Sequence, residues 1–170
     1  MRLLFITATF GFLAAVTAGQ GAPSCDMHHP AGVDARGDAV MGFDHEKTTH
    51  HFTLTAEGGV IAVSANDGKD MESRQAIRGH LAHIAKMFTA GDFEAPMLIH
   101  GRTPPGVPVM KDRKKTICYA YEDTPTGARI AISTADPRSL VAIHDFLRFQ
   151  IEDHRTGDST EVNRQAREAD

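Results

Sequence analysis

The stretch that decides the fold is Ile61-Ala62-Val63-Ser64-Ala65-Asn66-Asp67, which recurs almost unchanged as Ile130-Ala131-Ile132-Ser133-Thr134-Ala135-Asp136. A helical pattern opens with the same Ala-Ile pair after each copy, at Ala76 and at Ala142. Only a small difference in the connecting loop separates the two copies. Self-similarity of this kind is typical of an internal duplication. We therefore predict two structural repeats.

Each repeat has the pattern of two strands followed by a helix. The strands alternate apolar and polar side chains, and a Gly-containing turn separates the two strands of each pair. A Gly-Asp pair stands where each helical pattern stops, at Gly91 and at Gly157. The predicted strands are 51–55, 60–65, 116–122 and 128–134, the helices about 71–90 and 137–154, and the repeats about 48–92 and 114–158.

These elements predict an α+β fold, a duplicated ββα-ββα arrangement with two helices on one face of an antiparallel four-stranded sheet. A single domain is expected over 41–158. The other face of the sheet is expected to stay exposed or to form a homodimer. The connector at 93–115 is rich in Pro and Gly, and a connector of that length in a small domain is often functional.

Residues 1–18 have the composition of a secretory signal peptide. Arg2 supplies the positive charge, 3–16 are almost wholly apolar, and small residues favour cleavage after Ala18. The apolar run is shorter than the roughly 20 residues of a membrane-spanning helix, and no later segment is apolar enough to cross a bilayer. We expect a periplasmic or secreted protein, with a flexible arm at 19–40 and a disordered polar tail at 159–170.

The net charge of the chain and the sequence motifs that it lacks limit the classes of function to be considered. The net charge of −4 gives no indication of nucleic-acid binding. Ten His and seven Met occur among 170 residues, and every His lies beyond the predicted signal peptide. The sequence lacks the GxSxG, HExxH and phosphate-loop motifs, and it has neither CxxC nor CxxCH. These observations favour a binding protein over an enzyme.

The chain contains two cysteines, Cys25 and Cys118. In an exported protein such a pair can form a disulfide that ties the arm to the domain. Cys25 also has Met and His neighbours, so a free thiol that binds metal is the alternative reading. The sequence leaves both open.

The helix predicted at 71–90 carries a partial set of soft metal ligands. Helical spacing places His80, His83 and Met87 on one flank, beside the apolar stripe of the helix. The second repeat has Phe146 and Phe149 at the positions of His80 and His83. The imidazoles are therefore expected to face an aromatic wall, where they either bind a metal or pack against the rings.

Two further histidines are candidates to complete this site. His50 shares a strand face with Phe52, so it can approach the helix from the sheet. His100 belongs to the connector, which can fold over the site as a lid. The predicted metal ligands are His80, His83, His50, Met87 and His100.

Imidazole together with thioether favours copper, particularly the cuprous ion. Zinc is an alternative if a carboxylate joins the imidazoles. Non-covalent haem is a second alternative, because His or Met can be an axial ligand and phenyl rings can line the slot. The prediction is an exported metal-binding protein that handles copper with a metal-donor or acceptor protein. A structural or interaction domain without metal is the remaining alternative.

Overall fold

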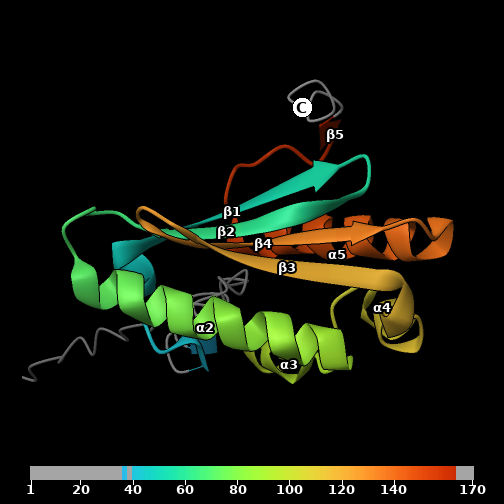
Figure 1. The fold of residues 1–170 in the computed structure, drawn as a ribbon, viewed down its shortest axis with the longest axis horizontal. Coiled ribbons are helices and arrows are strands. Elements are labelled where there is room, and N and C mark those ends of the chain that lie inside the picture. Colours follow the sequence, from blue (N-terminus) through green and yellow to red (C-terminus); the bar gives the residue numbers. More distant parts are fainter. Residues whose placement is uncertain (1–35, 38–39, 164–170) are drawn as a thin grey trace, which may run out of the picture.

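A five-stranded sheet and the helices α2–α5 make up the part of the chain that the computed structural model describes, residues 36–37 and 40–163 (Figure 1). The strands are β1 (Thr48–Thr55), β2 (Gly58–Ala65), β3 (Ile117–Thr124), β4 (Gly127–Thr134) and β5 (Val162–Asn163). The α-helices are α2 (Met71–Ala90), α3 (Glu94–His100), α4 (Val107–Asp112) and α5 (Pro137–His154). The short 3-10 helices η1 (His45–Lys47) and η2 (Lys114–Thr116) precede β1 and β3.

The strands lie in the order β3-β4-β2-β1-β5. The four longer strands pair antiparallel, whereas β5 pairs in parallel with the end of β1. The predicted α+β class is confirmed. The predicted four-stranded, fully antiparallel sheet is not confirmed, because a fifth strand extends the sheet beyond β1. The internal duplication remains a prediction.

Asp158 ties the segment that precedes β5 to β1. Its carboxylate accepts the backbone N–H of Phe52 at 2.8 Å and lies 2.9 Å from Nδ1 of His51. The sequence predicts a disordered tail over 159–170, and the structure places β5 within its first residues. A strand of only two residues has no period that a sequence pattern can reveal.

The long helices begin and end for local chemical reasons. Asp70 caps α2 by accepting the backbone N–H of Ser73, and Gly91 ends it in the left-handed conformation at φ 79°. Helix α5 is capped by Asp136 and has Pro137 in its first turn. Both helices have the predicted bounds. The residue that caps the end of α5 is Arg155, however, with φ 52°, and Gly157 has a positive φ of 76° two residues later.

The two long helices share one core on a single face of the sheet. Inward-facing residues such as Phe52, Ile61 and Ile130 lie in one cluster with Leu81 of α2 and Phe146 of α5. Helix α2 packs mainly over β3 and β4, whereas α5 packs mainly over β1 and β2. Each long helix therefore covers mainly the hairpin that does not directly precede it in the chain.

The connector between the hairpins is more regular than its sequence predicts. It folds into α3 and α4, and α4 packs against α5. Gly106 allows this contact, because a Cβ atom there would lie 2.0 Å from the carbonyl oxygen of Ala142. The connector thereby brings His100, the last residue of α3, to the core.

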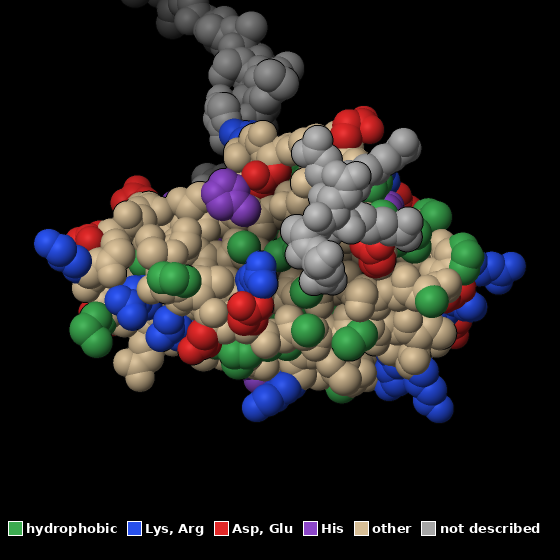
Figure 2. All heavy atoms as spheres, turned by 45° about the horizontal axis from the view of Figure 1, so that its top comes forward, with side chains coloured by type: hydrophobic (Ala, Val, Ile, Leu, Met, Phe, Trp, Pro, Cys, Tyr) green, Lys and Arg blue, Asp and Glu red, His purple; other side chains and the backbone are tan. Residues whose placement is uncertain are grey.

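Several sequence predictions concern residues outside the described part of the chain. They include the signal peptide at 1–18, Cys25 and most of the arm at 19–40. Cys118 is exposed on the edge strand β3. Within 36–37 and 40–163, no helix has both the length and the apolarity to cross a membrane. On the face seen in Figure 2, acidic and basic side chains are interspersed and the hydrophobic ones are scattered.

Candidate functional site

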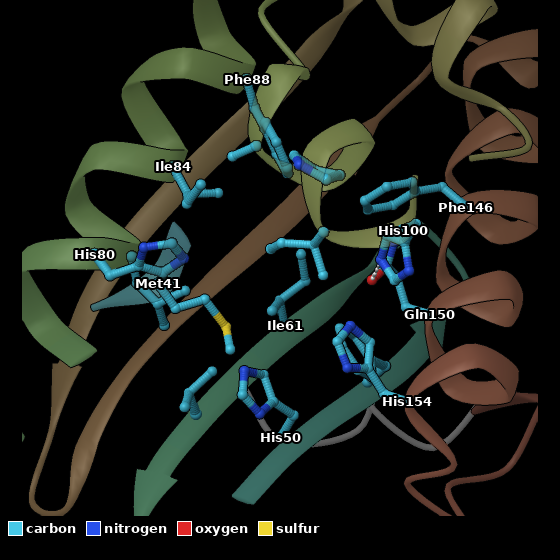
Figure 3. Close-up of a pocket in the computed structure, with 16 residues that line it drawn as sticks. Met41, His50, Ile61, His80, Ile84, Phe88, His100, Phe146, Gln150 and His154 are labelled. Atoms are coloured by element: carbon cyan, nitrogen blue, oxygen red, sulfur yellow. Dashed lines mark hydrogen bonds between the residues drawn. The ribbon is translucent and has the colours of Figure 1, made fainter. Parts of the chain in front are cut away.

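A small cavity of about 60 Å³ lies among α2, α3, α5 and the first hairpin (Figure 3). Most of its wall is apolar and comes from core side chains such as Ile61, Ile84 and Phe146. The polar side chains in the wall are His50, His80, His100, Gln150 and His154. A mostly apolar cavity with a few convergent polar groups is the usual form of a binding site.

His50 reaches the cavity because the alternation of β1 puts it on the inner face with Phe52, while His51 is exposed. Its ring stacks against Phe43, Phe52 and His154, with centroids 6.0, 6.3 and 5.5 Å away. Burial, and after it the charge of His154, lowers the pKa of His50 to about 3. The imidazole is therefore neutral at physiological pH, and one ring nitrogen retains a lone pair.

His80 approaches the same space from α2. Its ring makes an edge-on contact with Phe43 at a centroid distance of 5.6 Å. Burial, and after it the charge of His83, lowers the pKa of His80 to about 4. His80 is thus a second neutral imidazole, and Figure 3 shows it and His50 near the Met41 side chain.

His100 lies at the end of the cavity away from His80 (Figure 3), and only 7% of its surface is exposed. Its Nδ1 lies 2.6 Å from Oδ2 of Asp153, and its Nε2 lies 3.0 Å from Oε1 of Gln150. Arg102 also contacts Asp153, at 3.4 Å, and stacks over Phe149. Both ring nitrogens of His100 are engaged, so it can bind a metal only if one of these contacts breaks.

The structure does not bring the remaining predicted ligands to the cavity. His83 is exposed, and Met87 is half-buried against the core without lining the cavity. The cause is helix rotation: a step of three residues turns the side chain back by about 60°. His80 lies beside the buried stripe of α2, so His83 is carried to the solvent side. The two phenyl rings of the predicted aromatic wall also lie in different places. Phe146 lines the cavity, whereas Phe149 contacts His100.

Met41, Gln150 and His154 line the cavity but are absent from the predicted ligand set. Met41 is 8% exposed and precedes η1 in a segment without a regular pattern. Gln150 and His154 follow Phe146 at successive steps of four residues, so they share its buried side of α5. The sequence signal that could have identified Gln150 and His154 is that polar residues occupy these two steps of the apolar stripe of α5.

A second, larger cavity of about 280 Å³ adjoins the first, which we call the inner cavity. Its lining includes Thr48, Arg155 and three side chains shared with the inner cavity, Met41, His50 and His154. These three side chains therefore stand between the inner cavity and the outer one. All of them carry a nitrogen or sulfur atom that can bind a soft metal ion.

The donor atoms do not form a conventional metal centre. Across the described residues, no group of three or more His, Cys, Asp or Glu side chains is placed to hold a metal ion. The sulfur atom that lines this cavity beside the imidazoles is the thioether of Met41. Comparison with protein-family models, curated proteins and solved structures finds no match to this chain.

Proposed function

We propose that the inner cavity binds one cuprous ion through the imidazoles of His50 and His80 and the thioether of Met41. The observation that carries this proposal is that two neutral imidazoles and a buried thioether line one apolar cavity. Thioether and imidazole are ligands that suit copper, and thioether in particular selects its cuprous state. His154 stacks on His50 and lines the same cavity, so it shields this end from solvent.

The electrostatics of the cavity support a monovalent ion. A metal must displace protons from its ligands, and the low pKa values of His50 and His80 remove that competition at neutral pH. An apolar wall penalises charge, and this penalty is smaller for a monovalent ion than for a divalent one. Structural zinc almost always takes four nitrogen, sulfur or carboxylate ligands, more than the described residues group together.

The size of the cavity also distinguishes a bound metal ion from bound haem. Its volume of about 60 Å³ suits an ion. Sites for organic ligands usually exceed about 300 Å³. A porphyrin therefore does not fit without a large movement of α2 or α3, and we do not propose haem. Together with the predicted signal peptide, the copper site leads us to propose that this is an exported protein that exchanges copper with a donor or acceptor protein.

Anaerobic competition with a chromophoric cuprous chelator tests the proposal. The wild-type protein is expected to bind one equivalent. His80→Ala and His50→Ala should each weaken binding by about 100-fold, and Met41→Leu by about tenfold. His83→Ala is the matched control on the same helix, because His83 is exposed, and it should leave the affinity unchanged.

Two outcomes contradict the proposal. One is the absence of stoichiometric copper binding by protein whose circular dichroism shows a folded α+β domain. The other is equal loss of affinity in His80→Ala and His83→Ala, which would place the metal on the outside of α2. A Soret band after addition of haem would instead show that the cavity opens widely enough for a porphyrin.

A further inference from the structure

Strand β3 forms one edge of the sheet, and β4 is the strand with which it pairs among residues 36–37 and 40–163 (Figure 1). It is eight residues long, like β4, and the pairing runs from Ile117 to Thr124 without a bulge. It contains no proline and no lysine, and its charged residues stand near its end. Such devices usually protect an edge from pairing with another chain. The edge at β1, by contrast, is partly covered by β5.

The hydrogen bonds of β4 show which backbone groups of β3 point outward. The C=O of Thr126 accepts the N–H of Ala65, so it is directed toward β2. These directions alternate along an antiparallel strand, and the residues of β4 that bond toward β3 are the partners of Ala120 and its even-numbered neighbours. The N–H and C=O groups of Tyr119 and Tyr121 are therefore directed away from the sheet.

A groove of about 370 Å³ lies beside this edge, between β3 and α2. It is lined by Tyr119 and Tyr121 of β3 and by Ala82, Ala85, Lys86 and Thr89 of α2. The two tyrosines are on the same side of β3, because side chains two residues apart share a face of a strand. The two alanines are small and leave room beside the rings. The side chains of an added strand can therefore lie in the groove.

The two ends of β3 carry opposite charges. Basic residues stand at 113–115, just before the strand, whereas Glu122 and Asp123 stand near its end. These carboxylates contact Arg129 and Arg78, yet their side chains remain 59% and 57% exposed. A strand with the same charges that runs antiparallel to β3 would bring its basic end beside this acidic end. A second copy of β3 meets this requirement.

We propose that β3 pairs antiparallel with β3 of a second copy of this chain, so that the two sheets form one continuous sheet. The two-fold axis passes at Ala120. In this register Tyr119 of each copy lies opposite Tyr121 of the other, and their outward N–H and C=O groups bond to each other. The tyrosine side chains of both copies then meet on the side of the sheet that faces α2, where aromatic cross-strand pairs are favourable.

Sedimentation equilibrium of the metal-free full chain measures the association. A dimer is expected, with a dissociation constant roughly in the micromolar range. Tyr121→Pro removes an outward N–H from each copy and leaves the bonds to β4 in place, so it should weaken association by about tenfold or more. Tyr121→Val is the matched variant, because it keeps the N–H and loses the ring, and it should weaken association by only about threefold.

Disulfide cross-linking tests the geometry in protein with Cys25 and Cys118 replaced by serine. Ala120→Cys should cross-link rapidly under mild oxidation, because residues at the axis have Cα atoms about 4.5 Å apart, within the range of a disulfide. Ala131→Cys is the matched control, since Ala131 pairs with Ala120 on β4 and shares its face. It lies three strand spacings from its copy, roughly 14 Å, and should cross-link at least about tenfold more slowly.

Three results would overturn the proposal. The first is a monomer at about 100 µM protein, well above the expected dissociation constant. The second is equally fast cross-linking at the two positions, which would indicate a dimer through the outer face of the sheet. The third is slow hydrogen exchange of the Tyr121 N–H in dilute monomer, which would mean that another segment of the same chain covers the edge. No metal is present, so failure here and failure of copper binding are separate results.

Discussion

At the scale of single residues, burial determines the chemistry of the histidines. His50 and His80 carry the same side chain as the exposed His83, yet their rings are enclosed by Phe43 and the walls of the cavity. Desolvation disfavours the charged form, so both rings are held neutral. The same burial that makes them available to a metal also makes the fold sensitive to acid.

This sensitivity has a defined direction. In the unfolded chain both imidazoles titrate near 6.5, whereas in the folded protein their pKa values are about 3 and about 4. At pH values between the folded and the unfolded pKa values, the unfolded chain binds more protons than the folded protein. The stability of the fold therefore falls as the pH falls from about 6.5 toward 4. We expect the metal-free protein to lose about 4 kcal/mol of unfolding free energy between pH 7 and pH 5, roughly half of it from each imidazole.

Urea denaturation at the two pH values measures this loss. His50→Gln combined with His80→Gln removes both titrating groups and should flatten the pH dependence, even if it lowers the stability at pH 7. An unfolding free energy that stays constant from pH 7 to pH 5 in the wild-type protein would show that neither imidazole is desolvated.

At the scale of elements, two glycines illustrate how packing and propensity compete. Gly106 precedes α4 with φ 79°, and its Cα approaches Ala142 of α5 too closely for any side chain. Gly79 lies inside α2, is exposed, and has no atom within 4 Å of the place of a Cβ. The first glycine is required by a contact between helices, whereas the second only lowers the helix propensity of α2.

Alanine at each position should therefore act in opposite directions. Gly106→Ala is expected to destabilise the protein by about 2 kcal/mol or more, because the methyl group forces α4 away from α5. Gly79→Ala should stabilise it by about 0.5–1 kcal/mol. Urea denaturation of the two variants checks both signs, and a neutral Gly106→Ala would argue against the close contact of α4 with α5.

At the scale of the whole molecule, the connector is tied to the last helix by a polar cluster around the buried His100. Asp153 of α5 receives contacts from His100 and Arg102 at the end of α3 and just beyond it. This cluster positions α3 over the cavity and orients the Gln150 amide. Its members come from distant parts of the sequence, so they meet only when the connector folds back onto α5.

Removing the shared carboxylate should loosen this connection. Asp153→Ala leaves the buried His100 without its closest partner, and we expect a loss of about 3 kcal/mol in unfolding free energy. Asp145→Ala on the same helix is the control, because the contact of Asp145 with Arg148 at 3.6 Å is exposed and its loss should change stability by less than about 0.5 kcal/mol. Equal effects of the two substitutions would mean that the cluster does not hold the connector.

The sequence allowed accurate prediction of the features that depend on local order. The repeated stretch, the glycine at 91 and the apolar periods predict α2 and α5 with the bounds seen in the structure. The inward direction of His50 follows from the alternation of β1. Prediction was less successful for His83, because spacing along a helix shows which residues are neighbours but not where the buried stripe ends.

Thus the sequence by itself determined the α+β class, the two long helices and a histidine on the inner face of the first hairpin, since these depend on period and capping. Only the tertiary structure decided that α2 crosses over β3 and β4, that Met41 and Gln150 line one cavity with His50 and His80, and that β5 extends the sheet. These features depend on contacts between residues far apart in the chain. Local propensity carries no information about such contacts, because their free energy arises only when the elements pack.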